Sequence, residues 1–145
     1  MTTRILIMGL PGSGKTTFGQ ELVKRLMIKH TVKWFNADTV RKEFNDWDFS
    51  NEGRLRQAHR MREMADASGA DFAVCDFVCP IEQYRAIFDA DVIVWMDAIS
   101  EGRFEDTNKL FETPKKYDYR IKDWSTNARV IDWIMDNLDR FQESP

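Results

Sequence analysis

A glycine-rich stretch near the N-terminus constrains the fold of this chain more than any other part of its sequence. Residues 9–16 read GLPGSGKT and fit the pattern G-x-x-x-x-G-K-[ST]. They stand between a short apolar run at residues 4–8 and a segment with helical spacing from Lys15 onward. Glycines permit backbone dihedrals that other residues resist, so consecutive N–H groups can turn inward around an anion. The sequence therefore predicts a strand, a phosphate-binding loop (the P-loop, residues 9–16) and a helix whose positive end faces the phosphate.

The residue types of the P-loop predict binding of a nucleoside triphosphate. Lys15 is expected to reach the β- and γ-phosphates, and the Thr16 hydroxyl is expected to take one coordination place on Mg²⁺. The motif lies between an expected strand and an expected helix, and this context disfavours the alternative of a glycine-rich turn that binds no ligand. The expected nucleotide-binding residues are Gly9, Gly12, Ser13, Gly14, Lys15, Thr16 and Thr17.

Strand-like and helix-like segments alternate along the chain. The expected strands lie at residues 4–8, 32–35, 72–77, 91–96 and, as a short edge strand, 119–121. The expected helices lie at residues 15–29, 39–44, 50–69, 80–88 and 128–141. This alternation predicts an α/β fold with a doubly wound, mainly parallel sheet flanked by helices. We interpret residues 1–145 as a single domain with a polar, weakly periodic lid segment at about residues 99–118.

Composition and charge exclude several classes of protein. With 145 residues, 43% of them hydrophobic and 31% charged, the chain suits one folded domain rather than a disordered segment. Its 21 Lys and Arg against 24 Asp and Glu argue against non-specific nucleic-acid binding. No apolar run approaches the roughly 18 residues of a membrane span, and the first residues do not resemble a signal peptide. Together with only two cysteines, these features predict a soluble cytoplasmic protein.

A polar segment follows the second expected strand. Strand ends of a doubly wound sheet converge on a ligand crevice, and this strand ends in Asn36-Ala37-Asp38. Asp38 could accept a hydroxyl proton and orient the oxygen for in-line attack, and Arg41 could hold an anionic group on the acceptor. The alternative is that Asp38 only caps a helix beginning at Thr39 and that Arg41 lies on its solvated face. The P-loop favours the catalytic interpretation.

Three further features carry weaker signals. Asp76 ends the third expected strand and could receive Mg²⁺ through water, or could simply accept backbone N–H groups at a strand end. Cys75 and Cys79 have no His or Cys partner at metal-ligand spacing and are expected to be buried thiols. Trp124 and Trp133, at the last helix, are expected to serve core packing or a subunit contact.

The sequence resembles the adenylylsulfate kinases, P-loop enzymes that use MgATP to phosphorylate the 3′-hydroxyl of adenosine 5′-phosphosulfate. The similarity runs from Ile5 to about Phe111. The P-loop and Asp38-x-x-Arg41 are shared with other small hydroxyl kinases. More specific are Phe49-Ser50 followed by Arg54, Phe77-Val78-Cys79-Pro80 followed by Arg85, and Lys109-Leu110-Phe111.

The resemblance implies a role for each matching residue, with ATP and Mg²⁺ as cofactors. Lys15, Asp38 and Lys109 would be catalytic, Asp38 as base or orienting carboxylate and Lys109 beside the transferring phosphoryl group. The implied metal site is Thr16 with Asp76. The implied substrate-binding residues are Arg41 and Arg54 with Gln57 for the phosphosulfate, and Phe49 and Phe111 for the adenine. A core position for Phe49 and a lid-packing position for Phe111 are the alternatives. The implied partner is a small anionic substrate, and family members are commonly homodimers.

Departures from the family pattern leave the acceptor open. Asn36 stands where the family has a second aspartate. The lid segment is shorter than the family's, which leaves Arg103 and Lys109 as its basic residues between Asp97 and Lys109. A kinase for another hydroxyl, on a polynucleotide 5′-end, a nucleoside or a small alcohol, is the first alternative. A nucleotide-binding regulatory domain without transfer activity is the second.

Overall fold

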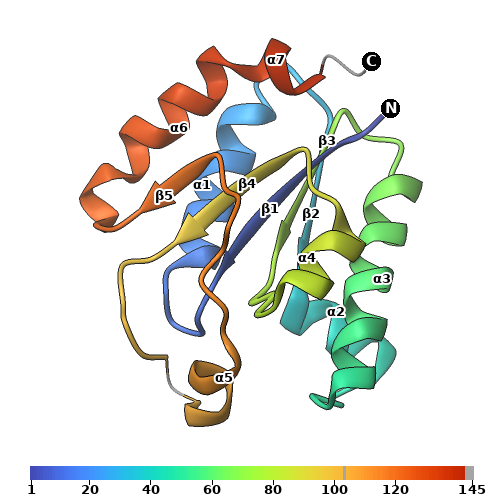
Figure 1. Cartoon of the computed structure of the whole chain (residues 1–145). Coiled ribbons are helices and arrows are strands. Elements are labelled where there is room, and N and C mark those ends of the chain that lie inside the picture. The colour runs from blue at the N-terminus through green and yellow to red at the C-terminus, as the bar shows by residue number, and fades with distance from the viewer. Residues whose placement is uncertain (103, 143–145) are drawn as a thin grey trace.

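The computed structural model describes residues 1–102 and 104–142, and a parallel five-stranded sheet forms its centre (Figure 1). The strands are β1 (Thr3–Gly9), β2 (Val32–Asn36), β3 (Phe72–Asp76), β4 (Val92–Met96) and β5 (Tyr119–Ile121). They lie in the order β2-β3-β1-β4-β5, and every pair is parallel. The carboxyl ends of all five strands therefore lie at one edge of the sheet, toward the α2 and α5 helices in the lower half of Figure 1.

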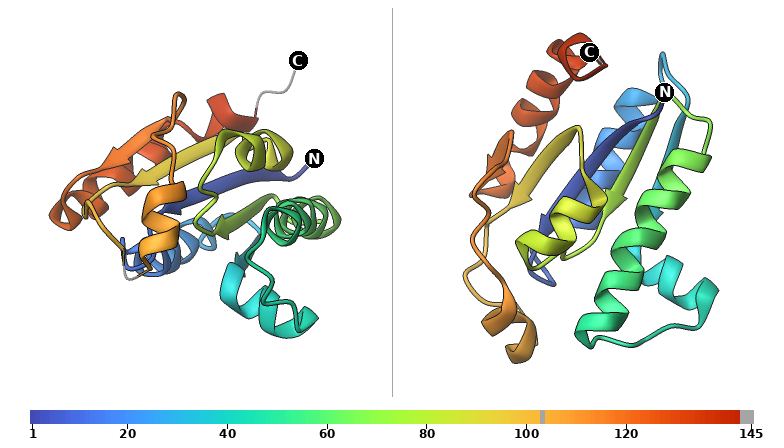
Figure 2. Two further views of the ribbon diagram at one scale, coloured as in Figure 1. Left: turned by 60° about the horizontal axis from the view of Figure 1, so that its bottom comes forward. Right: turned by 45° about the vertical axis from the view of Figure 1, so that its right-hand side comes forward.

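Helices cover both faces of the sheet, as the alternation predicted (Figure 2). The α-helices are α1 (Lys15–Leu26), α2 (Ala37–Phe44), α3 (Asn51–Ala67), α4 (Glu82–Phe88), α5 (Glu105–Leu110), α6 (Asn127–Asp136) and α7 (Leu138–Gln142). A 3₁₀ turn, η1 (Trp124–Thr126), leads into α6. Within the described part of the chain, no helix has both the length and the apolar character needed to cross a membrane.

The central strand divides its side chains between two hydrophobic cores. Ile5 and Ile7 face the layer that contains α1 and α6, whereas Leu6 and Met8 face the layer that contains α3 and α4. All four side chains are fully buried. A strand covered on both faces requires an unbroken apolar run rather than an alternating one, which is why residues 4–8 predicted this position. Cys75 and Cys79 are free, buried thiols, as expected.

The expected strands and helices are confirmed in order and type, but the structure shows one interruption within a helix and one helix that was not expected. The last helix, expected over residues 128–141, is interrupted at Asn137 and resumes as α7. The lid segment contains the six-residue helix α5, which its weak periodicity did not indicate. Asn36, and not Asp38, caps α2, because the Asn36 side chain accepts a hydrogen bond from the Thr39 amide at 3.1 Å. The capping interpretation of Asp38 is therefore wrong, and its carboxylate is available for another role.

Candidate active site

The P-loop connects the end of β1 to the start of α1. Gly9, Gly12 and Gly14 have φ angles of 152°, 85° and 94°, which side chains rarely permit. Gly14 is the residue before the first turn of α1 and has no side chain to satisfy the amides of that turn. Those amides lie at the positive end of the helix and suit an anionic ligand. The Lys15 Nζ donates to the Leu10 carbonyl oxygen at 3.0 Å, so the lysine side chain folds back along the loop.

A tryptophan from the far end of the chain lies against this loop. The Trp124 Nε1 donates to the Ser13 carbonyl oxygen at 2.8 Å. A Cβ atom added at Gly14 would lie 2.6 Å from the same Nε1. Trp124 is 49% exposed, so core packing, one of its two expected roles, is wrong, and the other, a subunit contact, stays a prediction. Its 111-residue separation from Ser13 explains why local sequence patterns gave no sign of the contact.

We expect Gly14→Ala to weaken nucleotide binding by about 100-fold, because the added methyl group meets both a strained φ and the Trp124 indole. The matched control is Gly69→Ala, since Gly69 has a φ of 68° but no atom within 4 Å of the added Cβ position. Isothermal titration of both variants with ADP and Mg²⁺ measures the effect. Equal affinity of the two variants would show that the close approach at Gly14 has no bearing on nucleotide binding.

Side chains from the ends of β2 and β3 and from α1 meet beside the P-loop. The Asp76 carboxylate accepts hydrogen bonds from the Trp34 Nε1 at 2.6 Å and from the Asn36 Nδ2 at 2.8 Å. The Asn36 Nδ2 also lies 3.4 Å from the Thr16 Oγ1. Burial raises the pKa of Asp76 to about 6, although the hydrogen bonds from Trp34 and Asn36 oppose the shift. The Asn36 side chain thus contacts both Thr16 and Asp76, the two residues expected at the metal site.

The oxygen atoms of this corner fit Mg²⁺ bound together with a nucleotide. In the described residues, no cluster of three or more His, Cys, Asp or Glu side chains could hold a metal by itself. Mg²⁺ in phosphate-transfer sites commonly takes one or two protein oxygens and completes its shell with phosphates and water. The exposed Thr16 hydroxyl and the nearby Asp76 carboxylate match that pattern.

A cavity lies between α2, the start of α3 and the loop after β3. Its volume is about 70 Å³, and we call it the arginine pocket. It brings together five of the expected residues, namely Asp38, Arg41, Phe49, Arg54 and Gln57. Its apolar wall is formed by residues 77–80 and Tyr84. Asp38 stands two residues after Asn36, so the pocket adjoins the Thr16–Asp76 corner.

Two guanidinium groups converge on one aromatic ring in this pocket. The Arg41 guanidinium lies 4.2 Å from the centroid of the Phe49 ring, and that of Arg54 lies 5.4 Å from it. Their hydrogen bonds go to backbone carbonyl oxygens, from Arg41 to those of Asp46 and Asp48 and from Arg54 to that of Phe49. Burial lowers the pKa of both arginines, which nevertheless stay charged.

Neither of these arginines forms an ion pair within residues 1–102 and 104–142. Arg41 is only 4% exposed, and the nearby carboxylates of Asp46 and Asp38 offset part of the cost of burying its charge. An anionic ligand in the arginine pocket would stabilise both guanidinium groups further.

Gln57 lines this pocket with its amide already hydrogen-bonded, whereas two other expected residues, Phe111 and Lys109, lie outside it. The buried Gln57 side-chain amide donates a hydrogen bond to the Ala37 carbonyl oxygen and accepts one from the Arg60 guanidinium. Phe111 packs on the Arg85 guanidinium at 5.1 Å and does not line the pocket with Phe49. Lys109 is exposed and pairs with Glu105 at 3.4 Å, one turn away on α5. Arg103 lies outside the described residues.

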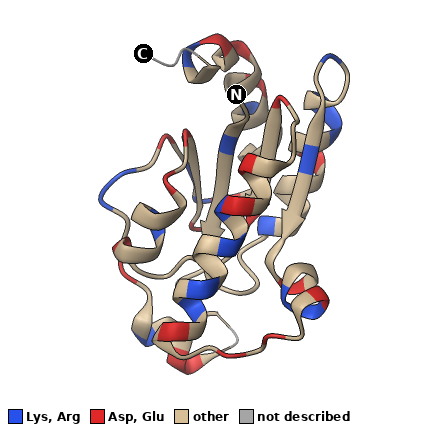
Figure 3. Ribbon diagram, turned by 90° about the vertical axis from the view of Figure 1, so that its right-hand side faces the viewer, with Lys and Arg blue, Asp and Glu red and all other residues tan. Residues whose placement is uncertain are grey.

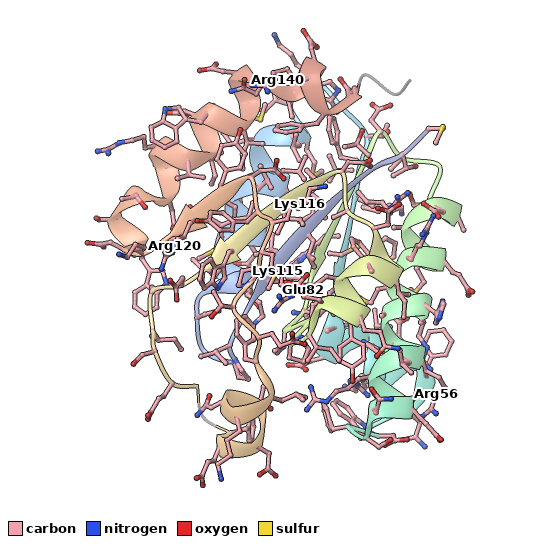
Figure 4. The ribbon with its side chains drawn as sticks, viewed as in Figure 1. Arg56, Glu82, Lys115, Lys116, Arg120 and Arg140 are labelled. Carbon is pink, nitrogen blue, oxygen red and sulfur yellow. The ribbon has the colours of Figure 1, made fainter. Side chains whose placement is uncertain are left out.

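The lid segment contacts both the P-loop and the wall of the arginine pocket. At one end, a Cβ added to Gly102 would lie 2.9 Å from the Pro11 carbonyl oxygen of the P-loop. At the other end, the Glu112 amide donates to the Pro80 carbonyl oxygen at 2.7 Å, in the pocket wall. The Lys115 amide donates to the Glu82 carboxylate at 3.0 Å (Figure 4). The lid segment therefore connects the P-loop to the wall of the arginine pocket.

Charges of both signs are distributed along the helices around the arginine pocket. In Figure 3, the Lys and Arg bands of α3 follow one another along the middle of the helix, and Asp and Glu bands lie toward both of its ends. Arg62, for example, pairs with Asp66 on the same helix. Among the described arginines of α2 and α3, Arg41 and Arg54 line the arginine pocket and form no ion pair, whereas the other three pair with carboxylates: Arg56, Arg60 and Arg62.

Comparisons with known proteins agree with this geometry. A family model described as an AAA domain matches residues 5–137. Cytidine diphosphoramidate kinase from Campylobacter jejuni is 29% identical over 86 residues, which are 59% of this chain and only 50% of that protein.

Two solved structures show the likeness in fold. Mycobacterium tuberculosis APS kinase CysC, in complex with AMPPNP and APS, has a TM-score of 0.73 at 18% identity and covers 95% of this chain and 98% of its own. A gluconokinase from Sinorhizobium meliloti 1021 has a TM-score of 0.65 at 13% identity, with 98% of both chains covered. The expected α/β fold of the P-loop kinase type is therefore confirmed.

Proposed function

The chain belongs to the AAA domain family, and on that premise we propose that it is an ATP-dependent kinase that phosphorylates a hydroxyl group of an anionic acceptor. One observation carries the proposal. Two guanidinium groups that form no ion pair with a described residue line one pocket together with the carboxylate of Asp38. Asp38 stands two residues after Asn36, whose side chain lies 3.4 Å from the Thr16 hydroxyl of the P-loop. A regulatory nucleotide-binding domain would need neither the arginines nor a carboxylate at this place.

The chemistry assigned to the site is an in-line transfer. The acceptor oxygen forms a bond to the γ-phosphorus of ATP while the bond to the β,γ-bridging oxygen breaks, so that ADP leaves. Asp38 takes the proton of the acceptor hydroxyl. Lys15 and the amides at the start of α1 neutralise the charge on the phosphates, which matters more than proton removal in a loose transition state.

Mg²⁺ and the lid segment complete the proposed site. Mg²⁺ would be held by Thr16 and, through water, by Asp76, and would supply further neutralisation of the phosphate charge. Lys109 would turn toward the transferring phosphoryl group, and Phe111 toward the acceptor base, when the lid segment closes over both ligands and excludes water.

We propose adenosine 5′-phosphosulfate as the acceptor to test first. Its phosphosulfate suits Arg41 and Arg54, and its base suits the half-exposed ring of Phe49. The names of two similar proteins, an APS kinase and a cytidine diphosphoramidate kinase, also denote nucleotide acceptors. A cavity of about 70 Å³ accommodates only part of a nucleotide, so the anionic end would enter the pocket and the base would remain near its mouth.

A coupled assay of ADP release tests the proposed function. The candidate acceptors are adenosine 5′-phosphosulfate, nucleosides, small polyols and 5′-hydroxyl oligonucleotides, each with ATP and Mg²⁺. We expect release that depends on adenosine 5′-phosphosulfate. Turnover with an uncharged acceptor alone would overturn the anionic class, and nucleotide binding without turnover of any acceptor would indicate a regulatory domain.

Replacing Arg54 distinguishes the arginine pocket from the rest of α3. We expect Arg54→Gln to raise the KM for the acceptor about tenfold and to leave the KM for ATP unchanged, because one charged hydrogen-bond donor is lost. Arg62→Gln is the matched control, since Arg62 lies on the same helix but pairs with Asp66 and the Ile87 carbonyl oxygen. Steady-state kinetics of both variants would contradict the assignment if their KM values for the acceptor rose equally.

A further inference from the structure

The loop between α2 and α3, residues 45–50, is held in place by arginines from α3. The Asp46 carboxylate accepts hydrogen bonds from the Arg56 Nε at 3.1 Å and the Arg60 Nη2 at 2.9 Å. Arg56 lies on α3 at the lower right of Figure 4. The Asp46 side chain is only 13% exposed, although the loop is at the surface. These hydrogen bonds hold the pKa of Asp46 well below its usual range, so the carboxylate stays ionised at neutral pH.

The backbone of the same loop holds the two guanidinium groups of the arginine pocket. The Arg41 Nη1 donates to the carbonyl oxygens of Asp46 and Asp48 at 2.9 and 3.1 Å. The Arg54 Nε donates to the carbonyl oxygen of Phe49 at 2.9 Å. Since a guanidinium is a planar fork, fixing one or two of its N–H groups fixes the direction of the others.

The loop has little freedom to shift without moving these groups. Two of its backbone amides donate hydrogen bonds. The Asp46 amide donates to the Arg41 carbonyl oxygen at 3.0 Å, and the Asp48 amide donates to the Asp46 carboxylate at 3.2 Å. A Cβ added to Gly53 on α3 would clash with the Asp48 carbonyl oxygen, so the loop packs directly on the helix backbone.

Charge gives Asp46 a second effect on the pocket. Arg54 and Arg60 both repel the charge of Arg41, and Asp46 is the carboxylate that favours the charged form of Arg41 most strongly. Removing the Asp46 charge would leave Arg56 and Arg60 without this partner and would push the guanidinium groups apart.

We propose that Asp46 is a positioning residue of the arginine pocket, which it does not line. Its carboxylate, held by Arg56 and Arg60, fixes the loop that orients Arg41 and Arg54 toward the acceptor. The inference rests on the proposed function, because it takes these two arginines as the groups that bind the acceptor.

Kinetics of Asp46→Asn provide the first test. We expect the KM for the acceptor to rise about tenfold, while kcat and the KM for ATP stay within about twofold, because the P-loop is untouched. Asp46→Glu, which keeps the charge, should recover most of the affinity. Asp132→Asn is the matched control, since Asp132 forms a 2.7 Å ion pair with Arg25 between α6 and α1. Equal changes in Asp46→Asn and Asp132→Asn, or a fall in kcat alone, would overturn the proposal.

A second measurement requires no turnover. We expect the side-chain Nε–H NMR signals of Arg41 and Arg54 to shift in Asp46→Asn, and the amides of Asp48 and Ser50 to exchange faster, whereas Asp132→Asn changes none of these signals. Unchanged signals in Asp46→Asn would overturn the positioning role. A wild-type chain without turnover of any acceptor would overturn the proposed function instead, and the NMR comparison would still decide whether Asp46 orients the two arginines.

Discussion

Lys15→Met is expected to lower kcat at least about 1,000-fold while the fold is retained. Lys15 is the first residue of α1, and its side chain already folds back along the P-loop to the Leu10 carbonyl oxygen. Methionine keeps the length and the apolar stem of the side chain but removes the positive charge that would oppose the β- and γ-phosphates. The loss should therefore appear in the transfer step, with little change in the melting temperature.

Lys24→Met is the matched control for this experiment. Lys24 is an exposed residue in the last turn of the same helix, away from the P-loop. Acceptor-dependent ADP release, together with circular dichroism melting of both variants, measures the difference. If Lys15→Met retained more than about a tenth of the wild-type rate, its ammonium group would have no place in the mechanism.

Asp38→Asn is expected to lower kcat about 100- to 10,000-fold, because the acceptor hydroxyl loses its proton acceptor. The KM for the acceptor should change little, since Arg41 and Arg54 remain in the arginine pocket. Asp38 lies in the first turn of α2 and does not cap that helix, so the substitution removes no capping hydrogen bond. A large loss of activity would therefore report the chemical step rather than the stability of α2.

Glu43→Gln, an exposed carboxylate on the same helix, is the control for Asp38→Asn. Steady-state kinetics with ATP held at saturation separate kcat from the KM for the acceptor. A variant at Asp38 with the kcat of the Glu43→Gln control would remove the carboxylate from proton transfer.

The parts of the site that local sequence predicted are those built from short-range patterns. The P-loop is a pattern of eight residues. Asp38, Arg41, Phe49 and Arg54 lie on two successive helices and on the loop that joins them. The structure brings those four residues into one pocket, as the sequence interpretation required. The segment that holds these residues follows the carboxyl end of β2, and the carboxyl ends of parallel strands lie together at one edge of the sheet.

The contacts that sequence could not predict join distant segments. Trp34 donates to Asp76 across 42 residues, and Trp124 reaches Ser13 across 111. Tryptophan is expected in almost any core, so its presence gives no sign of which polar group its N–H will meet. Such pairs depend on how the layers pack, which hydrophobic periodicity does not specify.

Two helix assignments failed for a related reason. Apolar residues continue past the break at Asn137, with Leu138 buried in the same core as Ile134, so periodicity alone could not reveal the interruption. In the lid segment, α5 is only six residues long and buries only Thr107. A helix of that length shows no clear apolar face, which is why the sequence indicated an irregular loop there.

Phosphorus-31 NMR of a reaction mixture tests the central claim most directly, because it identifies the product as well as the turnover. The sample would contain the protein, ATP, Mg²⁺ and adenosine 5′-phosphosulfate. We expect the ATP signals to be replaced by those of ADP and by a new phosphomonoester signal coupled to the ribose 3′ proton of the acceptor. Release of inorganic phosphate from an unchanged acceptor, or an unchanged ATP spectrum at saturating concentrations of both substrates, would contradict the claim that this chain phosphorylates that hydroxyl.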